Sequence, residues 1–75
     1  MTLFKLIGTT NDAIRPYEGK ACVVTENNRT NKLCINVINM CEITTSPMIA
    51  KEEIGDLIVA RTENSAYFFE RIATF

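Results

Sequence analysis

The chain has 75 residues, and its composition of 47% hydrophobic and 23% charged residues is typical of a folded globular domain. Eight basic and nine acidic residues give a net charge of −1 without a basic run. This argues against a nucleic-acid partner, because phosphate neutralisation supplies most of that affinity. The first residues lack the apolar core of a signal peptide, and no apolar run reaches membrane-spanning length. We therefore expect one domain over residues 1–75, cytoplasmic and without a membrane partner.

The first part of the chain predicts two strands separated by a long polar loop. Residues 2–7 and residues 20–26 are rich in apolar and β-branched side chains, as short strands are. The stretch 8–19 is polar and turn-forming, and Pro16 excludes a full helix there, although the Asn or Asp before it can cap one short turn. After the second strand, Asn27-Asn28 predicts a two-residue hairpin turn, because Asn tolerates positive φ.

The next stretch predicts one long strand that begins near Asn31 and includes Ile43. Its apolar residues keep one phase along the strand, and Asn39 interrupts that phase. Such an interruption is typical of a β-bulge or a sharp bend, where a long strand turns between two sheets. The alternative is that the stretch from Cys34 to Cys41 divides two separate strands. Pro47 then marks a strand edge, bulge or bend, after which residues 48–51 resume a strand.

The last third of the chain predicts two more strands, over residues 57–62 and 66–72, joined by a turn at Glu63-Asn64. Six short strands with closely spaced turns and no crossover-length connection indicate an all-β fold, a small antiparallel meander of about five or six strands. In a chain of this length we expect the meander to curl into an SH3-like barrel or a small sandwich.

The last predicted strand is apolar on both of its faces. At period two, one face carries Ala66, Phe68 and Ile72, and the other carries Tyr67, Phe69 and Ala73. A chain this short covers only one face of a sheet with its own core. We therefore predict that Tyr67 and Phe69, with Arg71, form an interface with another protein or a second copy of the chain. In the alternative, the chain itself covers both faces, with Ile14 and Tyr17 as the cover.

The polar loop is a second candidate site. It carries Asp12, Arg15 and Tyr17, and loops on small rigid barrels often bind ligands or partners. In the alternative, the loop is a solvated connection whose aromatic tip closes one end of the barrel.

The chain offers little for catalysis or metal binding. It has no histidine, so neither a Ser-His-Asp nor a Cys-His nucleophile forms within it, and its three glycines are isolated. Cys22, Cys34 and Cys41 lie in apolar segments and are expected to be buried structural thiols, while a zinc site would have to recruit carboxylates or be shared between subunits. We expect a protein that is not an enzyme and that needs no cofactor and no metal.

Two short segments carry a resemblance to other proteins. Thr45-Ser46-Pro47-Met48, followed by the segment from Thr62 to Tyr67 (TENSAY), resembles a T-S-P…T-x-N-S-x-Y pattern of small, uncharacterised β-rich proteins from bacteria and their phages. The resemblance covers roughly the C-terminal third of the chain. It implies a setting and a β-rich fold, and it implies no mechanism.

These observations favour a non-catalytic interaction protein that self-associates and binds a macromolecular partner, and phage-type inhibitors of host proteins are one class of this kind. The alternative is an oligomeric β-barrel that binds a nucleotide or single-stranded nucleic acid at subunit boundaries. Aromatic rings would then stack on bases while basic side chains meet phosphates. The residues expected to converge in that case are Arg15, Lys20, Arg61 and Arg71, near Tyr17 or Tyr67.

Overall fold

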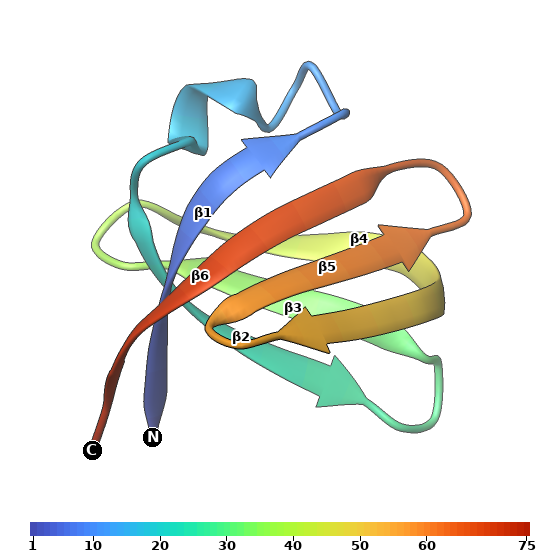
Figure 1. Ribbon diagram of the computed structural model, residues 1–75. Helices are drawn as coiled ribbons and strands as arrows, with labels where there is room; N and C mark the ends of the chain where they lie inside the picture. The colour runs from blue at the N-terminus through green and yellow to red at the C-terminus, as the bar shows by residue number, and fades with distance from the viewer.

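Six strands and one short 3₁₀ helix make up the computed structural model, which describes residues 1–75 (Figure 1). The prediction of an all-β protein is therefore confirmed. In chain order the elements are β1 (Thr2–Thr9), η1 (Arg15–Tyr17), β2 (Ala21–Asn27), β3 (Lys32–Val37), β4 (Cys41–Ile54), β5 (Leu57–Thr62) and β6 (Ala66–Thr74).

Each strand pairs antiparallel with the next strand in the sequence, as the meander prediction requires. The first and last strands also pair, from Thr2↔Thr74 to Thr9↔Tyr67, and this pairing closes the sheet into a barrel. In Figure 1 the two termini lie side by side below the barrel, where β1 and β6 leave it together. No helix of the chain has the length and apolar character needed to cross a membrane.

The predicted long strand that includes Asn31 and Ile43 is instead two strands, β3 and β4, joined by a tight turn. The N–H of Met40 donates to the carbonyl of Val37 over 3.0 Å, and Asn39 has a φ of 62°. A positive φ at the third residue of a β-turn is typical of a type II turn, for which Asn is suited. Asn39 thus interrupts the apolar phase because the chain reverses there, so of the two possibilities for this stretch the structure has two separate strands and not a bulge or bend.

A long strand that bends does exist, and it is β4. Up to Pro47, which pairs with Lys32, this strand runs beside β3; from Met48, which pairs with Thr62, it runs beside β5. Proline lacks an N–H, so it is tolerated where a strand changes partners. The carbonyl of Pro47 already accepts a bond of 3.0 Å from the N–H of Glu63 on the β5 side. Pro47 therefore marks a bend inside one continuous strand.

The turn after β2 is longer than the predicted two-residue turn. Asn27 pairs with Lys32, which leaves residues 28–31 in the loop. The side-chain Oδ1 of Asn27 accepts bonds from the backbone N–H groups of Arg29 (2.9 Å) and Thr30 (3.3 Å). Asn31, with a φ of 59°, supplies the left-handed residue that the turn needs. Asparagine residues therefore stabilise this turn, as predicted, but the two that do so are Asn27 and Asn31 and not Asn27 and Asn28.

The barrel interior is filled by inward-facing residues of all six strands, and β4 contributes the buried Thr45 together with Cys41, Ile43 and Met48, which are partly buried against the core. The buried apolar residues are Leu6, Cys22, Leu33, Ile35, Val37, Ile58, Ala60, Tyr67 and Phe69. Three buried threonines each have a hydrogen-bond partner; the hydroxyl of Thr45, for example, accepts a bond of 3.0 Å from the N–H of Leu33. The core therefore contains no buried side-chain polar atom without a partner.

Candidate functional site

The structure corrects the placement of an interface on Tyr67 and Phe69. Both rings face the barrel interior, where Tyr67 is 3% exposed and Phe69 is 1% exposed. The ring of Phe69 meets that of Phe4 edge to face, with centroids 6.2 Å apart. The chain's own core thus covers this face, and Ile14 and Tyr17 of the loop pack against that core.

Arg71, the third residue predicted for that interface, fastens β6 to the turn between β4 and β5. Its backbone N–H donates to the carbonyl of Asp56 over 2.8 Å, and its Nη1 lies 3.5 Å from Oδ1 of the same residue. Asp56 precedes the first residue of β5. Arg71 therefore has a structural partner within its own chain.

The predicted loop site is divided between two places. Nε of Arg15 lies 3.1 Å from Oδ1 of Asp12, and both side chains are exposed at the loop surface. Tyr17 instead packs against the core, and the Cys41 thiol beside it raises the pKa of the Tyr17 phenol above its usual value. The loop brings Asp12 and Arg15 together but directs Tyr17 onto the barrel.

The three cysteines are all free thiols and do not share one environment. Cys22 is fully buried, and burial raises the pKa of its thiol to about 11. Cys34 and Cys41 are only half-buried. The prediction of a buried structural thiol thus holds in full for Cys22 alone. No three His, Cys, Asp or Glu side chains lie close enough together to hold a metal ion.

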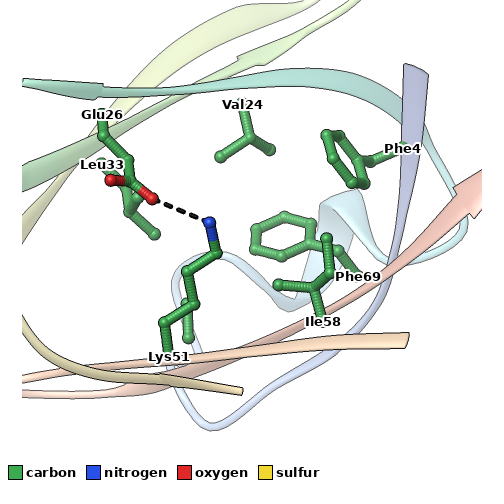
Figure 2. Close-up of a pocket in the computed structure, with 8 residues that line it drawn as sticks. Phe4, Val24, Glu26, Leu33, Lys51, Ile58 and Phe69 are labelled. Carbon is green, nitrogen blue, oxygen red and sulfur yellow. Dashed lines mark hydrogen bonds and ion pairs between the residues drawn. The ribbon is translucent and has the colours of Figure 1, made fainter. Parts of the chain in front are cut away.

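A mostly apolar pocket lies at one open end of the barrel, and we call it the end pocket. It has a volume of about 60 Å³, and Figure 2 shows side chains from opposite walls pointing into it. Six of its lining residues are hydrophobic, and the other two are charged. They are Phe4, Val24, Leu33, Ile58, Ala60 and Phe69, with Glu26 and Lys51.

The two charged residues bridge the mouth of the end pocket (Figure 2). Nζ of Lys51 lies 3.0 Å from Oε1 of Glu26 and 3.7 Å from Oε1 of Glu53. The hydrogen bond with Glu26 raises the pKa of Lys51 above its usual value. Glu26 and Lys51 line the pocket and their charges cancel, but Glu53 lies beside Lys51 without lining the pocket, so the three side chains together, which we call the rim, carry one negative charge in excess. All three side chains are partly exposed, so a ligand that approaches the mouth meets them first.

Unpaired strand edges border the end pocket. Only Ala21 and Cys22 of β2 pair with β1, so residues 23–27 pair with β3 on one side only. Likewise, residues 50–54 of β4 pair with β5 but with no strand on their other side. The pocket therefore lies where the barrel wall is incomplete.

Sequence reasoning missed this site because its residues come from all six strands, and Glu26 and Lys51 are 25 positions apart. One signal was present. Glu26 shares the period-two phase of Cys22 and Val24, so a charge follows two apolar residues on the inward face of β2. A charged residue in an inward phase indicates the end of the core or a site.

Comparison with known proteins finds no matching family model, no similar curated protein and no similar solved structure.

Proposed function

We propose that this chain is a non-catalytic interaction protein that binds another protein at the open end of its barrel. The observation that supports this proposal is the end pocket, an apolar hollow with a charged rim that lies beside unpaired strand edges. Apolar side chains that anchor an interface typically enter such hollows, and the surrounding polar rim excludes water. The lack of histidine in the chain supports a role without catalysis.

The size of the end pocket favours a side chain over a free cofactor. A dry cavity of about 150 Å³ holds one benzene ring, so in proportion 60 Å³ holds roughly two or three non-hydrogen atoms. Pockets for drug-sized ligands are several times larger, at about 300–1,000 Å³. The tip of a valine, leucine or isoleucine side chain from a partner fits this space.

Self-association belongs to the same proposal, and we assign it to the outer face of β5 and β6. Because Tyr67 and Phe69 point inward, Phe68 points outward, beside its cross-strand neighbour Val59. Leu57 shares this face, and Ile54, the partner of Leu57 on β4, is 64% exposed. Charges of both signs border these apolar residues, at Lys5, Glu52, Arg61 and Glu70. A mixed border is compatible with a self-complementary contact between two copies.

The alternative of a nucleotide site gains no support from the geometry. Tyr67 is buried and has no face free to stack on a base. Arg15 and Arg71 are already paired with carboxylates on separate parts of the surface. We therefore do not propose this function.

The proposal is tested by filling the end pocket. Ala60 is 2% exposed and lines the pocket, so Ala60→Val places two further carbons in it and leaves the surface unchanged. Ala66→Val makes the same change outside the core, and it serves as the matched control. Each protein is immobilised and exposed to lysate of the cells in which the chain occurs, with and without nuclease, and the retained proteins are quantified.

We expect one protein to be retained by the wild type and by Ala66→Val but lost from Ala60→Val, whatever the nuclease treatment. Equal retention on all three would remove the end pocket from the proposal. Retention that disappears with nuclease would favour a nucleic-acid partner.

Self-association is tested separately by sedimentation velocity. We expect weaker assembly for Ile54→Lys than for Ile38→Lys, which is an exposed control in the turn between β3 and β4.

A further inference from the structure

We infer that the partner docks as an extended strand on the free edge of β2, with an aliphatic side chain in the end pocket and a basic side chain two residues away. This inference rests on the proposed function and specifies the chemistry of its partner. It depends on three features of the molecule, which are the direction of the β2 backbone groups, the register that β1 leaves vacant, and the charge of the pocket rim.

The backbone of β2 presents unpaired groups toward the vacant side. The carbonyl of Lys20 accepts a bond of 3.1 Å from Leu6 in β1, whereas the carbonyl of Ala21 accepts one of 3.1 Å from Ile38 on the opposite side. Backbone groups in a strand alternate between its two edges. Those of Val24 and Glu26 therefore point to the β1 side, where β1 pairs with no residue of β2 beyond Cys22.

The chain does not fill this space itself, because β1 turns away. Thr2 and Leu3 pair with Thr74 and Ala73 of β6, so the start of β1 follows β6 away from β2. Figure 1 shows this divergence, with the N-terminus and the far end of β2 well apart at the bottom of the barrel. The place that a longer β1–β2 ladder would occupy is thus open to another chain.

The register of β1 fixes where an added strand places its side chains. Phe4 pairs with Cys22, so a strand that continues this register has one residue opposite Val24 and another, two positions away, opposite Glu26. Directly opposed residues in an antiparallel pair point to the same face, with Cβ atoms about 4.5–5.5 Å apart. Since Val24 and Glu26 line the end pocket, both added side chains face it.

The lining and the rim then select those two side chains. The position opposite Val24 lies near Phe4 and suits an aliphatic group of the size that the pocket accepts. The position opposite Glu26 meets a rim with two carboxylates and one ammonium group, which favours a lysine or arginine. Strand addition of this kind takes its affinity from backbone hydrogen bonds and its specificity from the pockets that receive alternate side chains.

The test uses a random dodecapeptide library selected on the immobilised wild-type chain, with counter-selection on Ala60→Val. The strongest binder is synthesised with a single N-methyl group at each backbone nitrogen in turn, and binding is measured by fluorescence anisotropy. We expect an aliphatic residue and a basic residue two positions apart. Methylation is expected to weaken binding about three- to tenfold at every second residue and to have little effect between. The amides of Val24 and Glu26 should exchange more slowly with solvent when the peptide is bound.

A binder whose affinity does not follow a period of two, or that leaves the exchange of both amides unchanged, would overturn strand addition. A library that yields no peptide specific for the wild type would do the same. None of these outcomes affects the lysate experiment. There, the proposed function is decided by whether the partner protein that the wild type retains is lost from Ala60→Val. Glu26→Gln is expected to remove the preference for a basic residue, whereas Glu63→Gln, in the turn before β6, should leave it intact.

Discussion

The neighbouring phenylalanines of β6 provide a direct test of which face of that strand is the core. Phe69 is 1% exposed and packs edge to face on Phe4, whereas Phe68 is half-buried on the outside of the barrel. Replacing a buried phenylalanine by alanine costs about 3–5 kcal/mol, and the lost aromatic pair places Phe69→Ala toward the upper end of that range. Phe68 loses only part of its burial, so we expect about 1–2 kcal/mol for Phe68→Ala.

These costs are large compared with the stability of the chain. At roughly 0.05–0.15 kcal/mol per residue, 75 residues have an unfolding free energy of about 4–11 kcal/mol. Phe69→Ala therefore removes a large share of the stability, and Phe68→Ala leaves most of it. Urea unfolding followed by circular dichroism measures both values. A stabilising osmolyte such as trimethylamine N-oxide keeps the weaker variant in range.

The comparison is decisive because both variants make the same chemical change in adjacent residues of one strand. If Phe68→Ala costs as much as Phe69→Ala or more, the assignment of inward and outward faces is wrong. The interface would then return to Tyr67 and Phe69, where the sequence pattern alone had placed it. Equal m-values for the two variants would show that the difference arises in the folded state.

Two further predictions concern turns and thiols. Asn39 has a φ of 62°, so Asn39→Ala should cost about 1–2 kcal/mol and Asn39→Gly should be close to neutral. Asn31 has a similar φ of 59°, but its side-chain amide also donates a hydrogen bond of 2.6 Å to the carbonyl of Met48. Asn31→Gly loses this bond and should cost about 1 kcal/mol. Equal effects of Asn31→Gly and Asn39→Gly on urea unfolding would contradict this prediction. The pKa of Cys22 is about 11 in the folded chain against an ordinary 9.0, so between these values the folded state holds a proton that the unfolded state has lost. Stability should therefore fall as the pH rises from 9 to 11, by at most about 2–3 kcal/mol, and the fall should be smaller in Cys22→Ala; a pH dependence unchanged in that variant would refute the assignment.

For β6, the period-two pattern of apolar residues predicted part of the structure, namely which residues share a face, but not which face is the core. The alternation correctly separated the set with Phe68 from the set with Phe69. It did not tell which set is inside, because each contains one phenylalanine and other apolar residues. The choice depends on partners distant in the sequence: Phe69 pairs with Leu6 and meets Phe4, whereas Phe68 covers Gly8. No local signal carries that information.

Two other differences between the predicted and the observed strands have local causes that the alternation of apolar residues does not reveal. The turn at Asn39 is flanked by the apolar residues Ile38 and Met40, so it lacked the polar composition by which turns are usually recognised. Register shifts in the β1–β6 pairing leave Ile7 and Ile72 without direct partners. Such bulges shift the phase of a strand by one residue, and a strict alternation cannot anticipate them. The antiparallel order of the strands was predicted correctly from the short connections. The number of strands agrees because two errors offset each other: the predicted strand that includes Asn31 and Ile43 is two strands, and the predicted strand over residues 48–51 is part of β4.

The charged rim of the end pocket has a second physical role, which sharpens the test of the strand-addition site. Exposed strand edges invite pairing between copies of a chain, and proteins oppose this by placing charged side chains there. Glu26 stands on the free part of β2, and Lys51 and Glu53 stand on the free part of β4. A rim that only protects the edges would repel every extended peptide, whatever its charge.

A rim that also selects a partner must discriminate between peptides of opposite charge. We therefore expect peptides that differ only in lysine or glutamate, two residues from the aliphatic anchor, to bind the wild type with affinities about tenfold or more apart. With Glu26→Gln the difference should shrink to less than threefold. Because Lys51 and Glu53 remain, this variant should stay free of aggregates by light scattering. If Glu26→Gln aggregates and the wild type binds both peptides equally weakly, the rim is protective only, and the free edge of β2 has no partner of the chemistry inferred above.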